Sequence, residues 1–146
     1  MSNSPEIILK AVRWFNCGIK CCVDPIVSLV FRVWAVWDFW KSGTLALKDF
    51  DNRIMLYEYE YKVPLLNPKV AAYLGTGVEL IFPALIMIGL ATRLSTIPLI
   101  FLVLVIEFTY QHSPDHMVWL ICLFMVMAHG PGMVSVDQLI AKMFKK

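Results

Sequence analysis

Long apolar segments constrain this chain more than any other feature. A helix needs roughly 20 mostly apolar residues to cross the hydrocarbon core of a bilayer. The segments close to that length are residues 24–42, 69–93, 94–111 and 115–133. They do not alternate in polarity as the strands of a membrane barrel would. Because 59% of the 146 residues are hydrophobic and only 16% are charged, we expect a membrane protein whose first partner is the lipid bilayer.

The connections between these segments predict how the spans are arranged. The turns "ATRLS" and "QHSPDH" are short, so the spans that they join should be antiparallel neighbours. Residues 43–68 form the long outer loop. We therefore predict an all-α fold, a single four-transmembrane-helix up-down bundle over residues 1–146. The polar and apolar residues near both ends predict an N-terminal interfacial helix and an amphipathic helix over 135–146.

The basic residues predict an orientation. Seven of them, Lys10, Arg13, Lys20, Arg93, Lys142, Lys145 and Lys146, fall on the side that holds both termini, and five fall on the other side. The positive-inside rule then places both termini in the cytoplasm and the long loop outside. The net charge of +2 and the lack of a basic block argue against a nucleic-acid partner.

Two groups that form charges lie near the middle of predicted spans. Arg32 belongs to the first and Glu79 to the second. An unpaired charge at that depth costs at least ~2.5–3.5 kcal/mol, so we predict that both face the bundle interior and contact each other. Pro83 leaves the carbonyl of Glu79 without its helical donor. The pair has two interpretations, a structural ion pair that fixes helix register and a contact for a proton, a quinone or a substrate.

The remaining polar groups of the spans fall on the outer half, which predicts a polar vestibule opening outward with Arg32 and Glu79 as its floor. Glu79 and Glu107 are the candidate proton relay. The candidate ligand-binding residues are Arg32, Asp38, Lys41, Tyr73, Tyr110 and His112. Asp38 and Lys41 have a second interpretation, since residues at i and i+3 of a helix form ion pairs, and Lys41 could equally extend to the lipid head groups.

No metal site is predicted. The candidate ligands His112, Asp115 and His116 are also explained by a helix start at Ser113-Pro114-Asp115. Cys17 and Cys21 lie one helical turn apart beside Cys22, on the side predicted to be cytoplasmic, where thiols stay reduced, and no role is assigned to them. We expect Cys122 to serve in packing.

Several blocks, in their order along the chain, resemble the DoxX family of small bacterial and archaeal membrane proteins. They are "LVFRVWAVWDFWK", "YEYKVPLLNPKVAAYL", "VELIFPALIMIGLATRL" and "HGPGMVSVDQLI". The family's Glu-Leu falls on Glu79 and Leu80, and its Arg and Lys of the first span fall on Arg32 and Lys41. Asp38 stands where the family usually has a small residue, so no role is carried over to it. The resemblance covers about residues 25 to 140 and implies a four-span bundle in the bacterial cytoplasmic (inner) membrane.

The resemblance also implies a function. The chain resembles membrane subunits of this family that are linked to thiosulfate:quinone oxidoreduction and to thiol and oxidative-stress complexes. A quinone-linked or sulfur redox subunit is therefore the first hypothesis. No flavin, haem or iron–sulfur motif is present, so no intrinsic cofactor is expected and electrons would come from a quinone or a soluble or membrane protein partner. The alternatives are a non-enzymatic membrane scaffold and a small-molecule transporter, and whether the chain is an enzyme or a homo-oligomer stays open.

Overall fold

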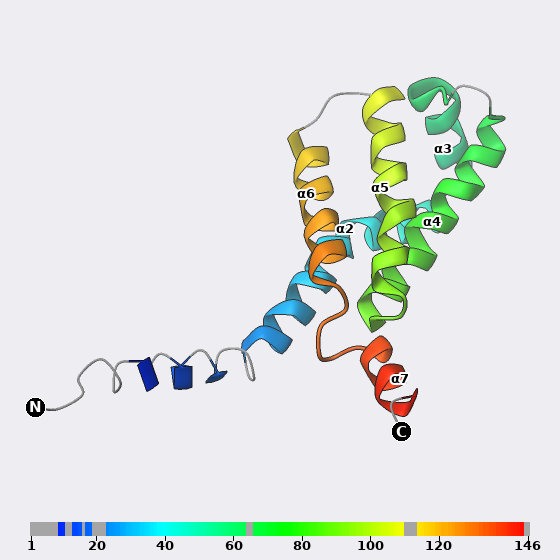
Figure 1. The fold of residues 1–146 in the computed structure, drawn as a ribbon. Helices are drawn as coiled ribbons and strands as arrows, with labels where there is room; N and C mark the ends of the chain where they lie inside the picture. Colours follow the sequence, from blue (N-terminus) through cyan, green and yellow to red (C-terminus); the bar gives the residue numbers. More distant parts are fainter. Residues whose placement is uncertain are drawn as a thin grey trace, which may run out of the picture.

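The computed structural model describes residues 9–10, 13–15, 17–18, 23–63, 66–109 and 114–144, and the regular structure in these ranges is helical. The all-α prediction is therefore confirmed for the described residues. The elements in chain order are α2 (Asp24–Lys48), α3 (Phe50–Met55), the π-helical turn η2 (Leu56–Tyr61), α4 (Pro68–Ile88), α5 (Thr92–Thr109), α6 (Pro114–His129) and α7 (Val136–Phe144) (Figure 1).

Two of the described helices, α4 and α5, are long and apolar enough to cross a membrane, and α6 is a shorter apolar helix. The helix α2 is longer than all three but carries charged residues along its length, namely Asp24, Arg32, Asp38, Lys41 and Lys48. Length and composition thus support a membrane span at two of the predicted positions.

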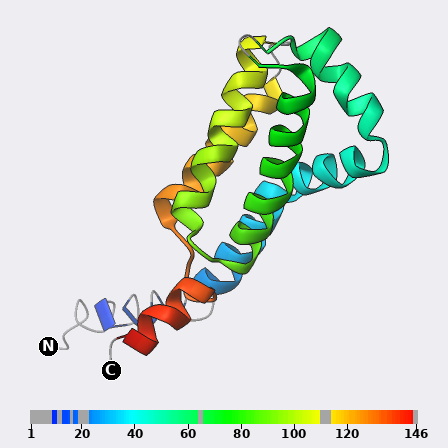
Figure 2. The same ribbon diagram turned by 90° about the vertical axis from the view of Figure 1, so that its right-hand side faces the viewer.

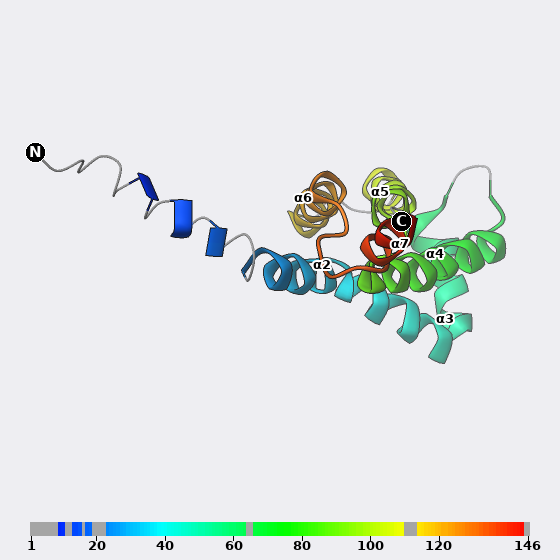
Figure 3. The same cartoon turned by 60° about the horizontal axis from the view of Figure 1, so that its bottom comes forward.

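The helices pack in two layers. α2 lies along α4, while α5 packs against α4 and α6 (Figure 3). Apolar side chains from these helices meet in the core, which includes Val36, Phe39, Ile86, Leu99 and Leu123. These buried side chains pack against one another, and close van der Waals contact between the helices holds the bundle together.

The second predicted span ends earlier than expected. Asn67 caps the start of α4 by accepting the N–H of Lys69 at 3.0 Å. The helix stops at Gly89, whose φ of 76° lies in the left-handed region that favours glycine. The predicted end at Arg93 is therefore wrong, because the chain turns at Gly89 and begins α5 at Thr92.

The next helix start is capped from the far end of the chain. Asp137 of α7 accepts the N–H of Ala91 at 2.8 Å and that of Thr92 at 3.2 Å. A carboxylate at a helix N-terminus satisfies N–H groups that have no helical partner. Asp137 thereby fixes α7 against the turn between α4 and α5.

The segment predicted as the long outer loop, 43–68, is largely helical. α2 continues through Gly43 to Lys48, after which Asp49 accepts the N–H of Asn52 at 3.1 Å and caps α3. α3 and η2 fold back beside α4, as the cyan and teal segments of Figure 2 show. Buried Tyr57 of η2 packs there with Ala71 and Ala72 of α4. The predicted end of the first span at residue 42 is thus wrong by more than one turn.

Both terminal segments are helical where they are described. α7 leaves Leu139, Ile140, Met143 and Phe144 exposed, as expected for an amphipathic helix, while Lys145 and Lys146 lie outside the described residues. The described residues of the N-terminal segment, 9–10, 13–15 and 17–18, are helical and exposed.

Close packing of α2 on α4 at Gly43 generates a prediction. A Cβ at this position would lie 2.9 Å from the Leu80 side chain and 3.2 Å from the carbonyl carbon of Glu79. We expect Gly43→Val to lower the free energy of unfolding by ~1–3 kcal/mol, because overpacking forces the helices apart. Thermal unfolding in detergent, followed by circular dichroism, measures this.

The matched control is Gly77→Val in α4, where nothing lies within 4 Å of an added Cβ. This variant should unfold near the temperature of the unmodified chain. Equal destabilisation by both substitutions would show that the α2–α4 contact is not tight.

Candidate functional site

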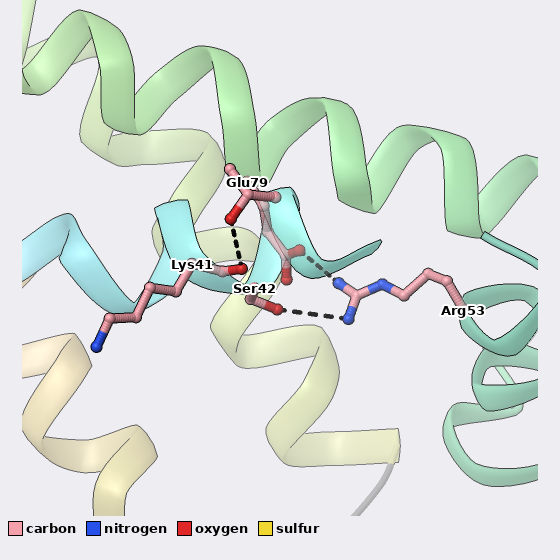
Figure 4. Close-up of polar contacts among 5 residues, drawn as sticks. Lys41, Ser42, Arg53 and Glu79 are labelled. Atoms are coloured by element: carbon pink, nitrogen blue, oxygen red, sulfur yellow. Dashed lines mark hydrogen bonds and ion pairs between the residues drawn. The ribbon is translucent and has the colours of Figure 1, made fainter. Parts of the chain in front are cut away.

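The buried carboxylate of Glu79 pairs with Arg53, not with Arg32. Oε2 of Glu79 lies 2.5 Å from Nη2 of Arg53, and both side chains are almost fully buried. Nη1 of Arg53 also approaches the hydroxyl of Ser42 at 3.4 Å. Figure 4 shows the Glu79 carboxylate and the Ser42 hydroxyl both facing the guanidinium of Arg53. Three elements, α2, α3 and α4, therefore meet at one ion pair.

The predicted contact between Arg32 and Glu79 is wrong, because a later part of α2 lies beside Glu79. Gly43 lies against Glu79 and Leu80, and Arg32 precedes Gly43 by 11 residues. That separation is about 16 Å along a helix. The prediction placed Arg32 at the middle of a short first span, whereas α2 runs on to Lys48 and Arg32 lies nearer its start.

Arg32 instead binds backbone carbonyls at the opposite end of the bundle. Its Nη1 donates to Pro131, and its Nη2 donates to Val134 at 3.0 Å and to Met87 at 3.3 Å. The side chain is 2% exposed. Arg32 thus satisfies a carbonyl at the end of α4 and joins α2 to the segment between α6 and α7.

A small polar cavity lies beside the Glu79 ion pair. Its volume is about 130 Å³, enough for several water molecules. The polar side chains that line it are Asp38, Ser42, Tyr61, Glu79 and His116, and the apolar ones are Phe39, Val103, Ile106 and Trp119. We call this the outer cavity, since it lies toward the end of the bundle predicted to face outward.

Glu107 has a partner that the sequence analysis did not foresee. Its Oε2 lies 2.6 Å from Nδ1 of His116, and both side chains are largely buried. The imidazole also packs against Trp119, with ring centroids 5.3 Å apart. His116, considered only as a metal ligand, enters the site as the partner of Glu107 and a wall of the outer cavity.

Two of the expected ligand-binding residues lie away from the outer cavity. Tyr73 is 65% exposed and stacks on Phe50, with ring centroids 4.4 Å apart. Lys41 is exposed with its ammonium 5.8 Å from the Trp37 ring, and no ion pair joins it to Asp38. Tyr110 and His112 lie outside the described residues.

Within the described part of the chain, no group of three or more His, Cys, Asp or Glu side chains could hold a metal ion. Asp115 is exposed in the first turn of α6, where the predicted helix start is confirmed at Pro114. Cys17 is exposed and Cys122 is buried, each as a free thiol, while Cys21 and Cys22 lie outside the described residues. The burial of Cys122 agrees with a packing role.

Arg53 and Ser42 are the site residues that sequence reasoning missed. Arg53 was counted only as a basic residue of an outer loop. A local signal for this helix was present, because Asp49 before "FDNR" is a typical helix cap. In a helix that starts there, Arg53 and Tyr57 lie one turn apart. A helix that folds back against α4 supplies the cation that buried Glu79 requires.

The fold and the buried polar groups define an all-helical protein with apolar helices suited to a membrane. The DoxX family model matches residues 27–112, and the chain belongs to the DoxX family. A relative from Haemophilus influenzae, described as an uncharacterized protein, is 25% identical over 143 residues, covering 88% of this chain and 93% of the relative. No solved structure matches. The matched range includes Arg32, Arg53, Glu79 and Glu107 but ends before His116.

The ion pair between Arg53 and Glu79 predicts strong coupling between the two positions. Arg53→Gln or Glu79→Gln alone leaves a buried charge without its partner, which typically costs ~3–5 kcal/mol. The double variant removes both charges, so its loss should be clearly smaller than the sum of the two single losses. Unfolding of all four proteins in the same detergent measures the coupling.

Lys48→Gln, which neutralises an exposed cation at the end of α2, is the control and should leave stability unchanged. Additive losses at Arg53 and Glu79 would contradict the assignment of this pair.

Tyr57 gives a prediction about alkaline pH. Burial raises the pKa of Tyr57 to about 12, and the Arg53 guanidinium acts in the opposite direction. A raised pKa means that the packed, neutral phenol stabilises the fold below pH 10, and this contribution is lost as the pH rises through about 12. Ultraviolet titration should therefore show a late tyrosinate phase that Tyr57→Phe removes. Tyr59→Phe, at an exposed position of the same turn, should keep that phase, and its loss there would refute the assignment.

Proposed function

We propose that the chain is a four-span subunit of the bacterial cytoplasmic membrane, with α2, α4, α5 and α6 crossing the bilayer and both termini in the cytoplasm. The apolar surface of α2 supports this proposal, since Val30, Trp34 and Trp37 are exposed while Arg32 is buried. α6 likewise exposes Ile121 and Phe124. The distribution of basic residues supports the orientation.

Within this subunit we propose that the outer cavity receives the head group of a quinone, as part of a redox complex. The observation that carries the proposal is the convergence of Asp38, Glu79 and His116 on one cavity, with Glu107 bonded to His116. Reduction of a quinone by two electrons takes up two protons and forms a quinol. Carboxyl and imidazole groups beside the ring can deliver those protons, and a redox partner protein would supply the electrons.

The dimensions of the outer cavity limit what enters it. Sites for whole drug-sized molecules measure roughly 300–1,000 Å³, whereas this cavity measures about 130 Å³. It suits a compact head group, with the isoprenoid tail lying between helices or in lipid. The same volume admits a small sulfur oxyanion, which is the second substrate class of the proposal.

Binding of a short-chain ubiquinone to the purified full chain in detergent tests this function. We expect saturable binding that His116→Gln weakens by about tenfold or more, since leaving a buried hydrogen-bonding group without its partner costs ~1–3 kcal/mol. Lys41→Gln, on the same helix as Asp38 but outside the cavity, should bind as the unmodified chain does. Absence of saturable binding, or equal binding by His116→Gln, would refute quinone binding here.

A membrane scaffold is the second candidate, and the closed ion pair between Arg53 and Glu79 favours it. On this interpretation the pair only fixes helix register. The double variant Arg53→Gln with Glu79→Gln then assembles with its partner and restores function. In a redox subunit that relies on the Glu79 carboxylate, the double variant assembles but stays inactive.

A further inference from the structure

A second and larger cavity lies at the end of the bundle opposite the outer cavity. Its volume is about 590 Å³, within the ~300–1,000 Å³ range of small-molecule sites. It is bounded by the first turns of α2, the last turns of α6 and the loop at Gly130–Gly132. In Figure 1 these parts are the blue start of α2 and the orange end of α6. We call it the inner cavity.

The inner cavity is mostly apolar, and its polar lining residues include Arg32, Asp24 and His129. Val27, Phe31, Met125 and Met133 supply apolar surface, and Arg32 lies among the lining residues. Val27 is 56% exposed and Met125 is 45% exposed, so the cavity opens at the side of the bundle, where a ligand could enter from lipid. Methionine side chains adapt to irregular apolar shapes, as binding of a flexible chain requires.

Arg32 is a buried cation that has no direct ion-pair partner among the described residues. A guanidinium has five N–H donors, and the bonds of Arg32 go to the neutral carbonyls of Met87, Pro131 and Val134. Its Nε is buried and has no hydrogen-bond partner among the described residues. The charge of Asp137 in α7 acts on Arg32 from beyond ion-pair distance, while its carboxylate accepts the N–H groups of Ala91 and Thr92. Holding the loop between α6 and α7 explains the bonds from Nη1 and Nη2, but it explains neither the free Nε nor the cavity beside it.

We propose that the inner cavity binds an amphiphile with an anionic oxygen head group. The carboxylate or phosphate would lie at Arg32, where it would compensate the buried charge and, after a small rotation of the guanidinium, accept from Nε. The acyl chain would follow Phe31 and the methionines toward the open side at Val27. A free fatty acid and an anionic membrane phospholipid share this chemistry. The site is separate from the outer cavity and does not depend on quinone binding.

Native mass spectrometry of the full chain, released from detergent and titrated with oleate or with dioleoyl phosphatidylglycerol, tests the proposal. We expect saturable binding of at least one of the two at a single site. Binding of oleate alone identifies a fatty-acid site, and binding of the phospholipid alone identifies a membrane-lipid site. Dioleoyl phosphatidylcholine carries the same chains without net negative charge and should bind far more weakly. Equal binding of this neutral lipid would overturn the proposal.

Variants locate the site without removing Arg32, whose loss could prevent folding. Val27→Trp fills the open side of the cavity and should weaken binding by about tenfold or more. Val30→Trp places the same side chain at an exposed position of α2 outside the cavity and should leave binding unchanged. Equal binding by Val27→Trp and the unmodified chain would overturn the proposal.

His116→Gln separates this inference from the proposed function. It alters the outer cavity and should leave oleate and phosphatidylglycerol binding intact even where it abolishes quinone binding. A loss of amphiphile binding in His116→Gln as large as that in Val27→Trp would place the ligand in the outer cavity and overturn the inner site.

Discussion

The guanidinium of Arg32 holds together one end of this protein. It lies inside the bundle and donates to carbonyls at the end of α4 and in the segment that leads into α7. Backbone carbonyls at a helix end have no helical donor, and in a membrane they have no water either. One buried cation therefore satisfies groups from distant parts of the chain, and the positions of α2, α4 and α7 depend on it.

At the opposite end of the bundle, a full ion pair compensates a buried charge. Glu79 lies deep in α4, and its cation arrives from outside the four long helices, because α3 folds back and inserts Arg53 beside Ser42. The charged groups of the two ends are thus compensated independently. The apolar core of Val36, Phe39, Leu99 and Leu123 lies between them, so a ligand in one cavity does not touch the other.

The sequence was sufficient for the helical class and for the position of most helices, because long apolar runs and short polar turns are local signals. The sequence was insufficient to predict which residues of neighbouring helices lie at the same level. Depth counted from the middle of each span assumed that both spans begin and end at the same level, and the continuation of α2 to Lys48 invalidates that assumption. Asp38 and Glu79 line one polar cavity, whereas Arg32 lies at the other end of the bundle and Tyr73 is exposed. Arg53 was missed as a site residue and His116 was considered only as a metal ligand, because each pairs with a residue from another helix and such contacts leave no short motif.

The partners of Arg32 also set an order of events during synthesis. Pro131 follows Arg32 by 99 residues and Val134 follows it by 102. At ~5–20 residues per second, a ribosome needs about 5–20 s to make the intervening chain. Throughout that interval Arg32 lacks two of its three carbonyl acceptors, because only Met87 precedes Pro131 and Val134 in the chain. Because Arg32 is near the start of α2, its long side chain can extend toward the lipid head groups until these contacts form. The contacts of Arg32 with Pro131 and Val134 therefore form only after the loop before α7 has been synthesised.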